Sequence, residues 1–185
     1  MNGPVFFTDR LILRPPVPED FEPFAAFHAE EDTMTYLGGV QPRSTAWRNF
    51  CGFVGAWQVR GYAMFSVIER DSGAWVGRVG THYPEGWPGR EVGWGVARAF
   101  AGKGYAFEAA CVAMDFAVDL LGWDEVIHCI APENARSIAL ARRLGSALIG
   151  PTELPPPVEP GLHIDNWGQS AAQWRAQRAR VRQGG

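Results

Sequence analysis

The sequence predicts an α+β domain in which one mixed, mostly antiparallel sheet is flanked by helices. Three strand-like segments follow one another at 62–69, 74–83 and 91–97, joined by turn sequences, as in an antiparallel meander. A long apolar helix pattern begins after Gly104, and Gly122 ends it. The next strand-like run, Glu125–Ala131, is reached through that helix and should therefore lie parallel to the strand at 91–97.

The composition is that of one ordinary globular domain. The chain has 185 residues, 46% hydrophobic and 20% charged, which suits a single core. The net charge of −3 gives no broad basic surface for nucleic acid. We find no long apolar run or signal peptide, and therefore expect no membrane association and a cytoplasmic protein. Cys51, Cys111 and Cys129 form no close pair and no metal-binding pattern, so we expect reduced thiols and no metal.

A short strand and two helices should precede the meander. Arg10–Arg14 is the strand, and Pro18 opens the first helix, which ends at the acidic run 30–32. Ser44 is the expected N-cap of the second helix and Gly61 its end. The expected inner face of this second helix consists of Trp47, Phe50, Cys51, Val54 and Trp57.

The C-terminal third alternates strands with helices. Asn134 should cap a helix that Gly145 closes, and residues 147–150 form a short strand. A proline-rich loop spans 152–161, and a last strand spans 162–167. Residues 170–182 predict a basic tail helix, so we divide the chain into a domain at 1–168 and a tail at 169–185. On the long helix, Glu108, Cys111, Asp115 and Asp119 share one narrow polar stripe, and the apolar residues, Leu120 included, fill the rest.

The segment 91–110 carries the strongest chemical signal. Val92, Trp94 and Val96 alternate against Glu91 and two glycines in a strand at 91–97, which a loop at 98–103 joins to the helix. Gly102 and Gly104 allow the backbone to approach a ligand closely. The first N–H groups of the helix are unpaired and lie at the positive end of its dipole, so the loop predicts a phosphate or pyrophosphate site, with Lys103 adding charge.

Two common phosphate motifs are excluded. A Walker loop needs Ser or Thr after its lysine, but Gly104 follows Lys103. The dinucleotide fingerprint needs a third Gly or Ala, but that position is Phe107 or Arg98, depending on which glycines are counted.

Two motifs resemble the GNAT acyltransferase superfamily. Glu-Val-Gly-Trp-Gly-Val at 91–96 with Gly-Lys-Gly-Tyr-Ala-Phe-Glu-Ala at 102–109 resembles its acetyl-CoA-binding strand, loop and helix, and 134–145 resembles its second motif. Thr8–Arg14 is similar to the branch that acetylates protein N-termini, ribosomal proteins among them. The resemblance spans roughly Val5 to Trp167. It implies a GNAT-like fold in which the strands at 91–97 and 125–131 splay apart and the cofactor's pantetheine arm enters between them.

The resemblance also implies the cosubstrate acetyl-CoA and a set of binding residues. The backbone of Trp94 and Val96 would pair with the pantetheine amides, and the Val96 N–H would stabilise the oxyanion. The remaining expected contacts are the N–H groups of Gly102, Lys103, Gly104, Tyr105 and Ala106 with the phosphates, and the side chains of Asn134 and Ser137. Arg98, Arg142 and Arg143 either reach the phosphates or are surface charges.

For each candidate catalytic residue, both a catalytic and a non-catalytic role stay open. Glu91 is either the general base or substrate anchor, or it only pairs with Arg78 or Arg90; His82 and a water chain are the other candidate bases. Many family members have a tyrosine acid where this chain has Ala141. Ser137 is the nearest polar substitute, or it only hydrogen-bonds the cofactor or its own helix.

The leading hypothesis is an N-acetyltransferase that moves the acetyl group of acetyl-CoA directly to a primary amine in a ternary complex. The amine is a protein N-terminus or a small molecule, with Glu30, Glu31 and Asp32 attracting it and His163 and Trp167 as the opposite wall. The alternative is a non-catalytic CoA-binding sensor or interaction module, motivated by Ala141 and the arginine-rich tail. A different acyl donor, such as succinyl-CoA, and a homodimer formed through the tail stay open.

Overall fold

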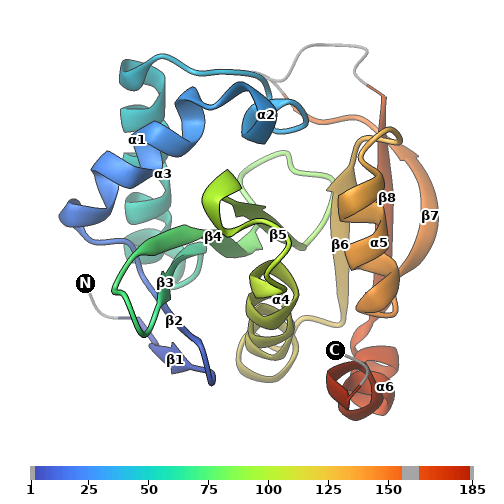
Figure 1. Ribbon diagram of the computed structural model, residues 1–185. Coiled ribbons are helices and arrows are strands. Elements are labelled where there is room, and N and C mark those ends of the chain that lie inside the picture. The colour runs from blue at the N-terminus through green and yellow to red at the C-terminus, as the bar shows by residue number, and fades with distance from the viewer. Residues whose placement is uncertain (1–2, 156–162, 184–185) are drawn as a thin grey trace.

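The computed structural model describes residues 3–155 and 163–183, and an eight-stranded sheet runs through it in the order β1-β2-β3-β4-β5-β6-β8-β7 (Figure 1). The strands are β1 (Phe6–Phe7), β2 (Leu11–Arg14), β3 (Met64–Glu69), β4 (Trp75–His82), β5 (Glu91–Val96), β6 (Glu125–Ile130), β7 (Ala147–Thr152) and β8 (Ile164–Ser170). The helices are η1 (Pro18–Asp20), α1 (Phe21–Ala29), α2 (Glu31–Met34), α3 (Arg43–Arg60), η2 (Arg98–Phe100), α4 (Tyr105–Asp115), the π-helix η3 (Phe116–Leu120), α5 (Ala135–Arg143) and α6 (Ala171–Gln183).

The pairing of the strands confirms the predicted fold class. Every neighbouring pair is antiparallel except β5 and β6, which are parallel, as the helical crossover requires. The β4–β5 ladder is continuous from Gly77↔Val96 to His82↔Glu91, whereas β5 and β6 are joined at a single position, Glu91↔Ile127. Beyond that position the two strands part.

Two helical groups cover the sheet around separate apolar clusters. Buried residues of α4 share the larger cluster with Leu13, Phe65 and Val92 of the sheet. Helices α1 and α3 pack on each other and, through Phe24 and Phe50, form the second cluster with Trp75. In Figure 1, α4 crosses the centre of the sheet in front, α1 and α3 lie together at the upper left, and α5 lies beside β6.

The second helix differs from its prediction at both its start and its inner face. It begins at Arg43 after Pro42, whose backbone is extended, so Ser44 lies in the first turn and is not the N-cap. Phe50 and Trp57 are buried as predicted, but Trp47 is 51% exposed and Cys51 is exposed, because the buried stripe also runs through Ala46. The buried stripe thus contains Ala46 in place of Trp47, and Cys51 lies outside it.

The first helix ends at the acidic run, as predicted, and the same run also begins a second short helix. Glu30 separates α1 from α2, and Glu31 and Asp32 form the first turn of that second short helix. Carboxylates in a first turn complement the helix dipole.

The long helix has two parts. Cys111 is buried, and after Asp115 the chain continues as η3 with π-type geometry. The extra residue in a π-turn rotates the following side chains around the axis. Leu120, predicted to be buried, is therefore 62% exposed.

The predicted tail helix is present as α6 and packs against α4. Trp174 is fully buried in the cluster that contains α4, and its Nε1 donates to Asp115 Oδ1 at 2.9 Å. Arg175, Arg178 and Arg182 pair with the carboxylates of Asp115 and Asp119. Before it, β7 begins at Ala147 as predicted and extends two residues further, to Thr152, whereas β8 ends at Ser170, three residues beyond the predicted end. The expected start of that last strand at 162 and most of the proline-rich loop lie outside the described residues. No helix in the described part of the chain is both long and apolar enough to cross a membrane.

Candidate active site

The space where β5 and β6 part, called the gap here, exposes backbone amides of β5. Ala97 N donates to Val76 O at 2.9 Å across the β4–β5 ladder. Alternate residues of an antiparallel strand bond to the same neighbour, so Val92, Trp94 and Val96 direct their N–H and C=O groups away from β4 and toward β6. Because β6 pairs only at Glu91, the amides of Trp94 and Val96 face the gap.

Two side chains replace ladder hydrogen bonds where the strands begin to part. Ile127 N still donates to Arg90 O at 3.0 Å. The next donor on β6, Cys129 N, reaches the carboxylate of Glu91 at 3.3 Å instead of a backbone carbonyl. The carbonyl of Val92 accepts from the His128 ring at 2.6 Å. At the end where the strands part, the backbone groups of both strands therefore have side-chain hydrogen-bond partners.

His128 is held in one neutral state by its neighbours. Its Nδ1–H donates to Val92 O, so Nε2 is the acceptor and receives the Ser146 hydroxyl at 3.0 Å. Gln169 Nε2 donates to the same Ser146 oxygen at 3.0 Å. Burial lowers the pKa of His128 to about 4, so the ring is uncharged near neutrality. Sequence reasoning did not single out His128, since its partners are far from it along the chain.

The predicted phosphate loop has the backbone conformation that requires glycine. Gly102 and Gly104 have φ values of 77° and 81°, and Gly104 is the N-cap of α4. The N–H groups of the first helical turn, those of Tyr105 and Ala106 included, have no acceptor within the helix. Arg10, which the sequence did not suggest, donates to Lys103 O at 2.9 Å and pairs with Glu108, fixing the loop against α4.

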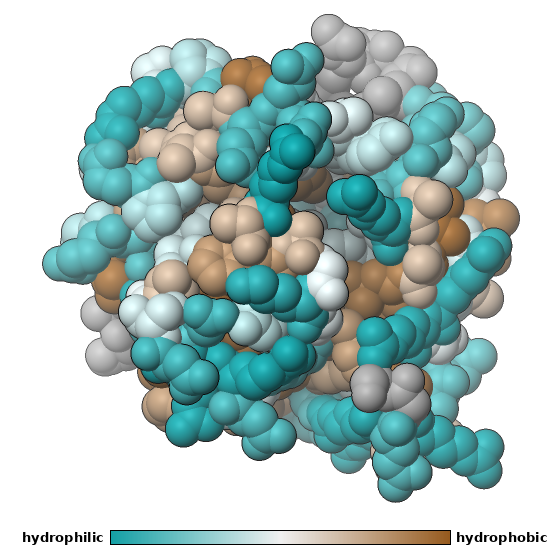
Figure 2. Space-filling model, viewed as in Figure 1, coloured by the Kyte–Doolittle hydropathy of each residue, from teal (hydrophilic) through white to brown (hydrophobic). Residues whose placement is uncertain are grey.

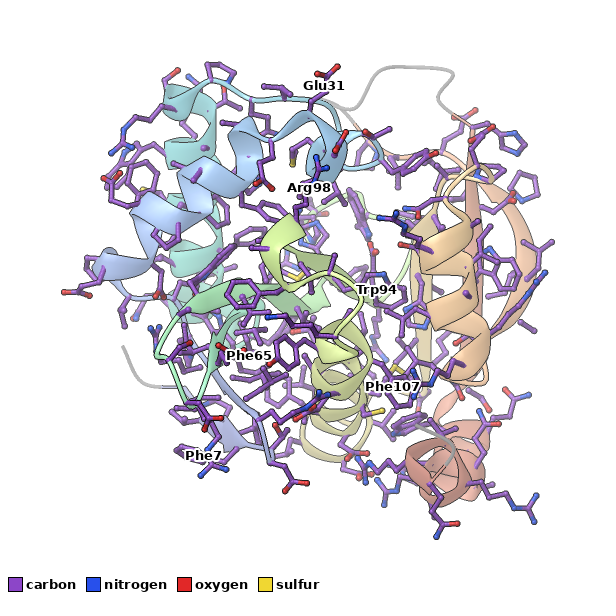
Figure 3. All side chains as sticks on the ribbon, in the orientation of Figure 1. Phe7, Glu31, Phe65, Trp94, Arg98 and Phe107 are labelled. Carbon is purple, nitrogen blue, oxygen red and sulfur yellow. The ribbon has the colours of Figure 1, made fainter. Side chains whose placement is uncertain are left out.

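The side chains near this loop are mostly engaged elsewhere. Lys103 Nζ lies 4.9 Å from the Phe100 ring centroid. Tyr105 is buried and donates its hydroxyl to Glu69 Oε1 at 2.5 Å, so only its backbone is available to a ligand. Arg98 pairs with Asp32 of α2, and Figure 3 shows it extending toward the helix on which Glu31 is labelled. Arg142 and Arg143 lie over the rings of Trp167 and Phe107 at 5.1 and 3.7 Å.

The second motif lies directly across the gap. Asn134 caps α5, as predicted, and its Oδ1 accepts from Ser137 N at 3.1 Å. Trp94 Nε1 donates to Ser137 Oγ at 3.1 Å, so the side chains of β5 and α5 meet, and Figure 3 shows Trp94 between these elements. Ala141 is fully buried against Ile130 and Trp167.

One cavity joins the gap to the space beneath α3. Its volume is about 730 Å³. The polar and charged residues that line it include Arg78, His82, Glu91 and His128 of the sheet and Asn134 and Ser137 at the start of α5. Figure 2 shows apolar residues reaching the surface between α4 and α5, where the gap lies. The cavity therefore brings Glu91 and Ser137 into the same space as the backbone of β5.

Glu91 is buried in the cavity wall with a raised pKa. It is 7% exposed, and burial raises the pKa of its carboxyl group to about 7 although hydrogen bonds from Trp87 Nε1 (2.6 Å) and Cys129 N oppose the shift. Among the described residues it forms no ion pair with Arg78 or Arg90, and Arg90 lies 4.0 Å from Asp124 instead. Pairing with an arginine therefore does not explain this carboxylate.

Two further titratable groups of the cavity, His82 and Cys129, are neutral near pH 7. Burial, assisted by the charge of Arg78, lowers the pKa of His82 to about 4, which makes its imidazole a weak base. Burial raises the pKa of the Cys129 thiol strongly, so a nucleophilic thiolate is disfavoured. No group of three or more potential metal ligands lies together in the described part of the chain.

The residues that the sequence suggested for the acceptor site do not line this cavity. None of Glu30, Glu31 and Asp32 is among the described residues that line the cavity. His163 is exposed and lies 3.4 Å from Asp165, and Trp167 is buried beneath Arg142. The walls are built instead by α3 and by the β4–β5 connection, through side chains such as Phe53 and Trp87.

Comparison with known proteins identifies the class to which this site belongs. A family model described as an acetyltransferase (GNAT) domain matches residues 10–147. The chain therefore belongs to the GNAT acetyltransferase family, as the two motifs predicted, and acetyl transfer is the activity of that class.

Individual relatives agree with this assignment. An uncharacterized N-acetyltransferase, p20, of Bacillus licheniformis is 26% identical over 142 residues, 75% of this chain and 79% of that protein. The crystal structure of an acetyltransferase from Agrobacterium tumefaciens strain C58 is similar with a TM-score of 0.78 at 28% identity, covering 91% of this chain and 96% of that one. A ribosomal-protein-serine acetyltransferase-like protein from Vibrio cholerae has the same fold, with a TM-score of 0.73 at 20% identity over 90% and 97% of the two chains.

Proposed function

We propose that the protein is an acetyl-CoA-dependent N-acetyltransferase that transfers the acetyl group directly to a primary amine in a ternary complex. The observation that carries this proposal is that one cavity is lined both by β5 at Trp94, whose backbone amide faces the gap, and by the buried carboxylate of Glu91. A pantetheine chain needs backbone partners, and an attacking amine needs a base. The gap supplies both within one enclosed space.

The residues present fit acetyl-CoA. The Trp94 and Val96 amides face the gap and match the amide groups of a pantetheine arm. The loop at Gly102–Gly104 directs N–H groups of the α4 N-terminus outward, which suits a diphosphate, and Asn134 and Ser137 border the gap from α5. When bound, acetyl-CoA supplies an acetyl group activated as a thioester. We propose that the Val96 N–H, which points away from β4, donates to the oxyanion that forms during acyl transfer.

Glu91 is the proposed general base. An ammonium group is not nucleophilic, so the acceptor must lose one proton before or during attack on the thioester carbon. A carboxylate with a pKa of about 7 accepts this proton near neutrality and is deprotonated often enough to act. The amine nitrogen then forms the new amide bond, the carbon–sulfur bond breaks, and the sulfur leaves as a thiolate or takes up a proton.

The leaving thiolate needs little assistance. A thiol has a pKa of about 8.5, so its conjugate base leaves readily without a strong acid. Ser137 is the proposed donor or water-positioning group, since its hydroxyl borders the gap and already accepts from Trp94. The raised pKa of Cys129 disfavours an acyl-enzyme on that residue and supports direct transfer.

The test is thiol release from acetyl-CoA in the presence of a panel of primary amines. We expect release that depends on the amine and saturates with acetyl-CoA. A rise in melting temperature with CoA but no release with any amine would favour the alternative, a CoA-binding sensor or interaction module, for which Ala141 in place of a tyrosine is the specific observation. Faster release from succinyl-CoA would change the proposed donor and leave the site intact.

A further inference from the structure

Arg78 is a cation that lines the cavity without a partner. Its Nε is buried and has no hydrogen bond, and no described residue forms an ion pair with its guanidinium. The rings of Phe53 and Phe27 lie 5.5 and 5.9 Å from its Cζ. Burying a charge without a partner is costly, so a ligand that supplies the missing acceptor would bind favourably.

Arg78 and Glu91 lie on the same face of the sheet. Arg78 is opposite Gly95 and Glu91 is opposite His82, so their rows are four residues apart, about 13 Å along the strands. Gly93 lies on the same face between these rows, and a Cβ there would be 3.2 Å from Glu91 Oε1. The glycine leaves room above the sheet for the two long side chains to approach a common ligand.

The electrostatics agree with this placement. The positive charge of Arg78 contributes to the lowered pKa of both His28 and His82. The charge of Glu91 opposes the fall that burial causes in the pKa of Arg78, which lies at about 10. The guanidinium is therefore charged at neutral pH and within electrostatic reach of the proposed base.

We infer that the acceptor is a small amine that carries a carboxylate, such as a free α-amino acid, with its carboxylate on Arg78 and its amino group at Glu91. A planar guanidinium matches a carboxylate through two parallel hydrogen bonds. The neighbouring walls contributed by Phe53, Met64 and Trp87 suit an apolar substituent on the amino acid. This inference rests on the proposed function and adds the chemical class of its acceptor.

The competing explanation is that Arg78 only balances the charge of Glu91. In that case a carboxylate on the acceptor would not increase kcat/KM, because the charges of Arg78 and Glu91 would already neutralise each other. The two explanations differ in how the enzyme ranks amines that are identical except for the carboxylate.

The experiment measures thiol release with leucine, leucinamide and 3-methylbutylamine, and with phenylalanine, phenylalaninamide and 2-phenylethylamine. Each rate is divided by the concentration of the unprotonated amine at the assay pH, because the compounds differ in amine pKa. We expect kcat/KM for each amino acid to exceed that for its carboxylate-free analogues at least 10-fold, mainly through KM. Arg78→Met should reduce this preference at least 10-fold, and Arg78→Lys should reduce it less. Arg48→Met, which removes an exposed cation of the same cavity, should leave the preference unchanged.

Each outcome decides between the explanations. Release at equal rates within each series, or fastest release with a C-terminally amidated peptide that lacks acidic side chains, overturns the inference and leaves the proposed function standing. If no amine supports release, the proposed function fails, and calorimetry of leucine with CoA-loaded protein decides: heat that Arg78→Met abolishes supports recognition of the carboxylate, and no heat overturns it. If Arg78→Met does not fold, the wild-type ranking and Arg78→Lys decide.

Discussion

The two edges of β5 differ in how completely they are paired. Toward β4 the strand is bonded along its whole length, and toward β6 it is bonded only at Glu91. The paired edge is a rigid support, whereas the open edge leaves backbone groups available to a ligand in a cavity that is already formed. The difference shows that a sheet can leave backbone groups unpaired within a cavity when side chains satisfy the end of the interrupted ladder.

The strongest test of the open edge is Glu91→Gln, which removes the proposed base and keeps its shape. We expect kcat to fall about 10²–10⁴-fold. The wild-type rate should rise with pH through about 7, where Glu91 loses its proton, and this limb should disappear in the variant. Steady-state kinetics between pH 5.5 and 8.5 measure both effects.

Stability provides the control for Glu91→Gln. The folded protein holds the Glu91 proton up to about pH 7 and the unfolded chain releases it near 4.5, so wild-type stability falls as pH rises between these values. Glutamine does not ionise, so the variant avoids the cost of burying this charge and should be more stable than the wild type at pH 8 by up to about 3 kcal/mol. Full activity in a stable Glu91→Gln protein would exclude Glu91 as the base.

The closed end of the gap is tested by His128→Leu. The substitution leaves Val92 O and the Ser146 hydroxyl without their partner, and we expect a loss of about 2–4 kcal/mol in the free energy of unfolding. Urea denaturation at pH 7.5 measures this loss. His163→Leu, at an exposed position, is the matched control and should change stability by less than about 0.5 kcal/mol.

The pH dependence of stability sharpens the same comparison. The pKa of His128 is lowered from 6.5 to about 4 in the folded protein, so the unfolded chain binds the proton first as pH falls. The contribution of the neutral ring is complete above pH 6.5 and is lost progressively toward pH 4. His128→Leu should show a flatter stability curve than the wild type over this window; parallel curves would show that His128 does not carry the effect.

A smaller effect is expected in the predicted phosphate loop, where Gly102→Ala can be compared with the matched control Gly73→Ala. Gly102 and Gly73 have φ values of 77° and 70°, and an added Cβ would meet nothing within 4 Å at either position. Alanine at each should therefore cost a similar 1–2 kcal/mol or so of backbone strain. We expect only Gly102→Ala to raise KM for acetyl-CoA, by about 5- to 30-fold, because only its loop would face the phosphates. Equal KM values in the two variants would contradict the assignment of the loop.

The smallest effect is expected where α6 joins the second half of the sheet to α4. Arg178 pairs with Asp115 at 3.0 Å and with Asp119, but it is partly exposed, so Arg178→Ala should lose less than about 1 kcal/mol. Arg180→Ala, at an exposed position without an ion pair among the described residues, should lose nothing measurable. A larger loss for Arg178 would mean that these ion pairs, rather than the burial of Trp174, hold the two halves together.

Sequence alone determined the features that depend on neighbours along the chain. The alternation in Glu91–Val96, the glycines before α4 and the Asn134 cap are local signals, and all three elements form where they were predicted. Phe50 and Trp57 are buried in α3 as predicted, but the predicted burial of Trp47, Cys51 and Leu120 is wrong, because the rotation of a helix depends on what packs against it.

Only the tertiary structure decided which distant residues share the cavity. The β4–β5 register places Arg78 and Glu91 on one face of the sheet, Arg10 reaches the predicted phosphate loop from the residue before β2, and His128 closes the gap from β6. These relations join residues separated by as many as 93 positions, and no periodicity in one chain records them. The raised pKa of Glu91 follows from burial that the whole sheet creates, so it too could be known only once the fold was in place.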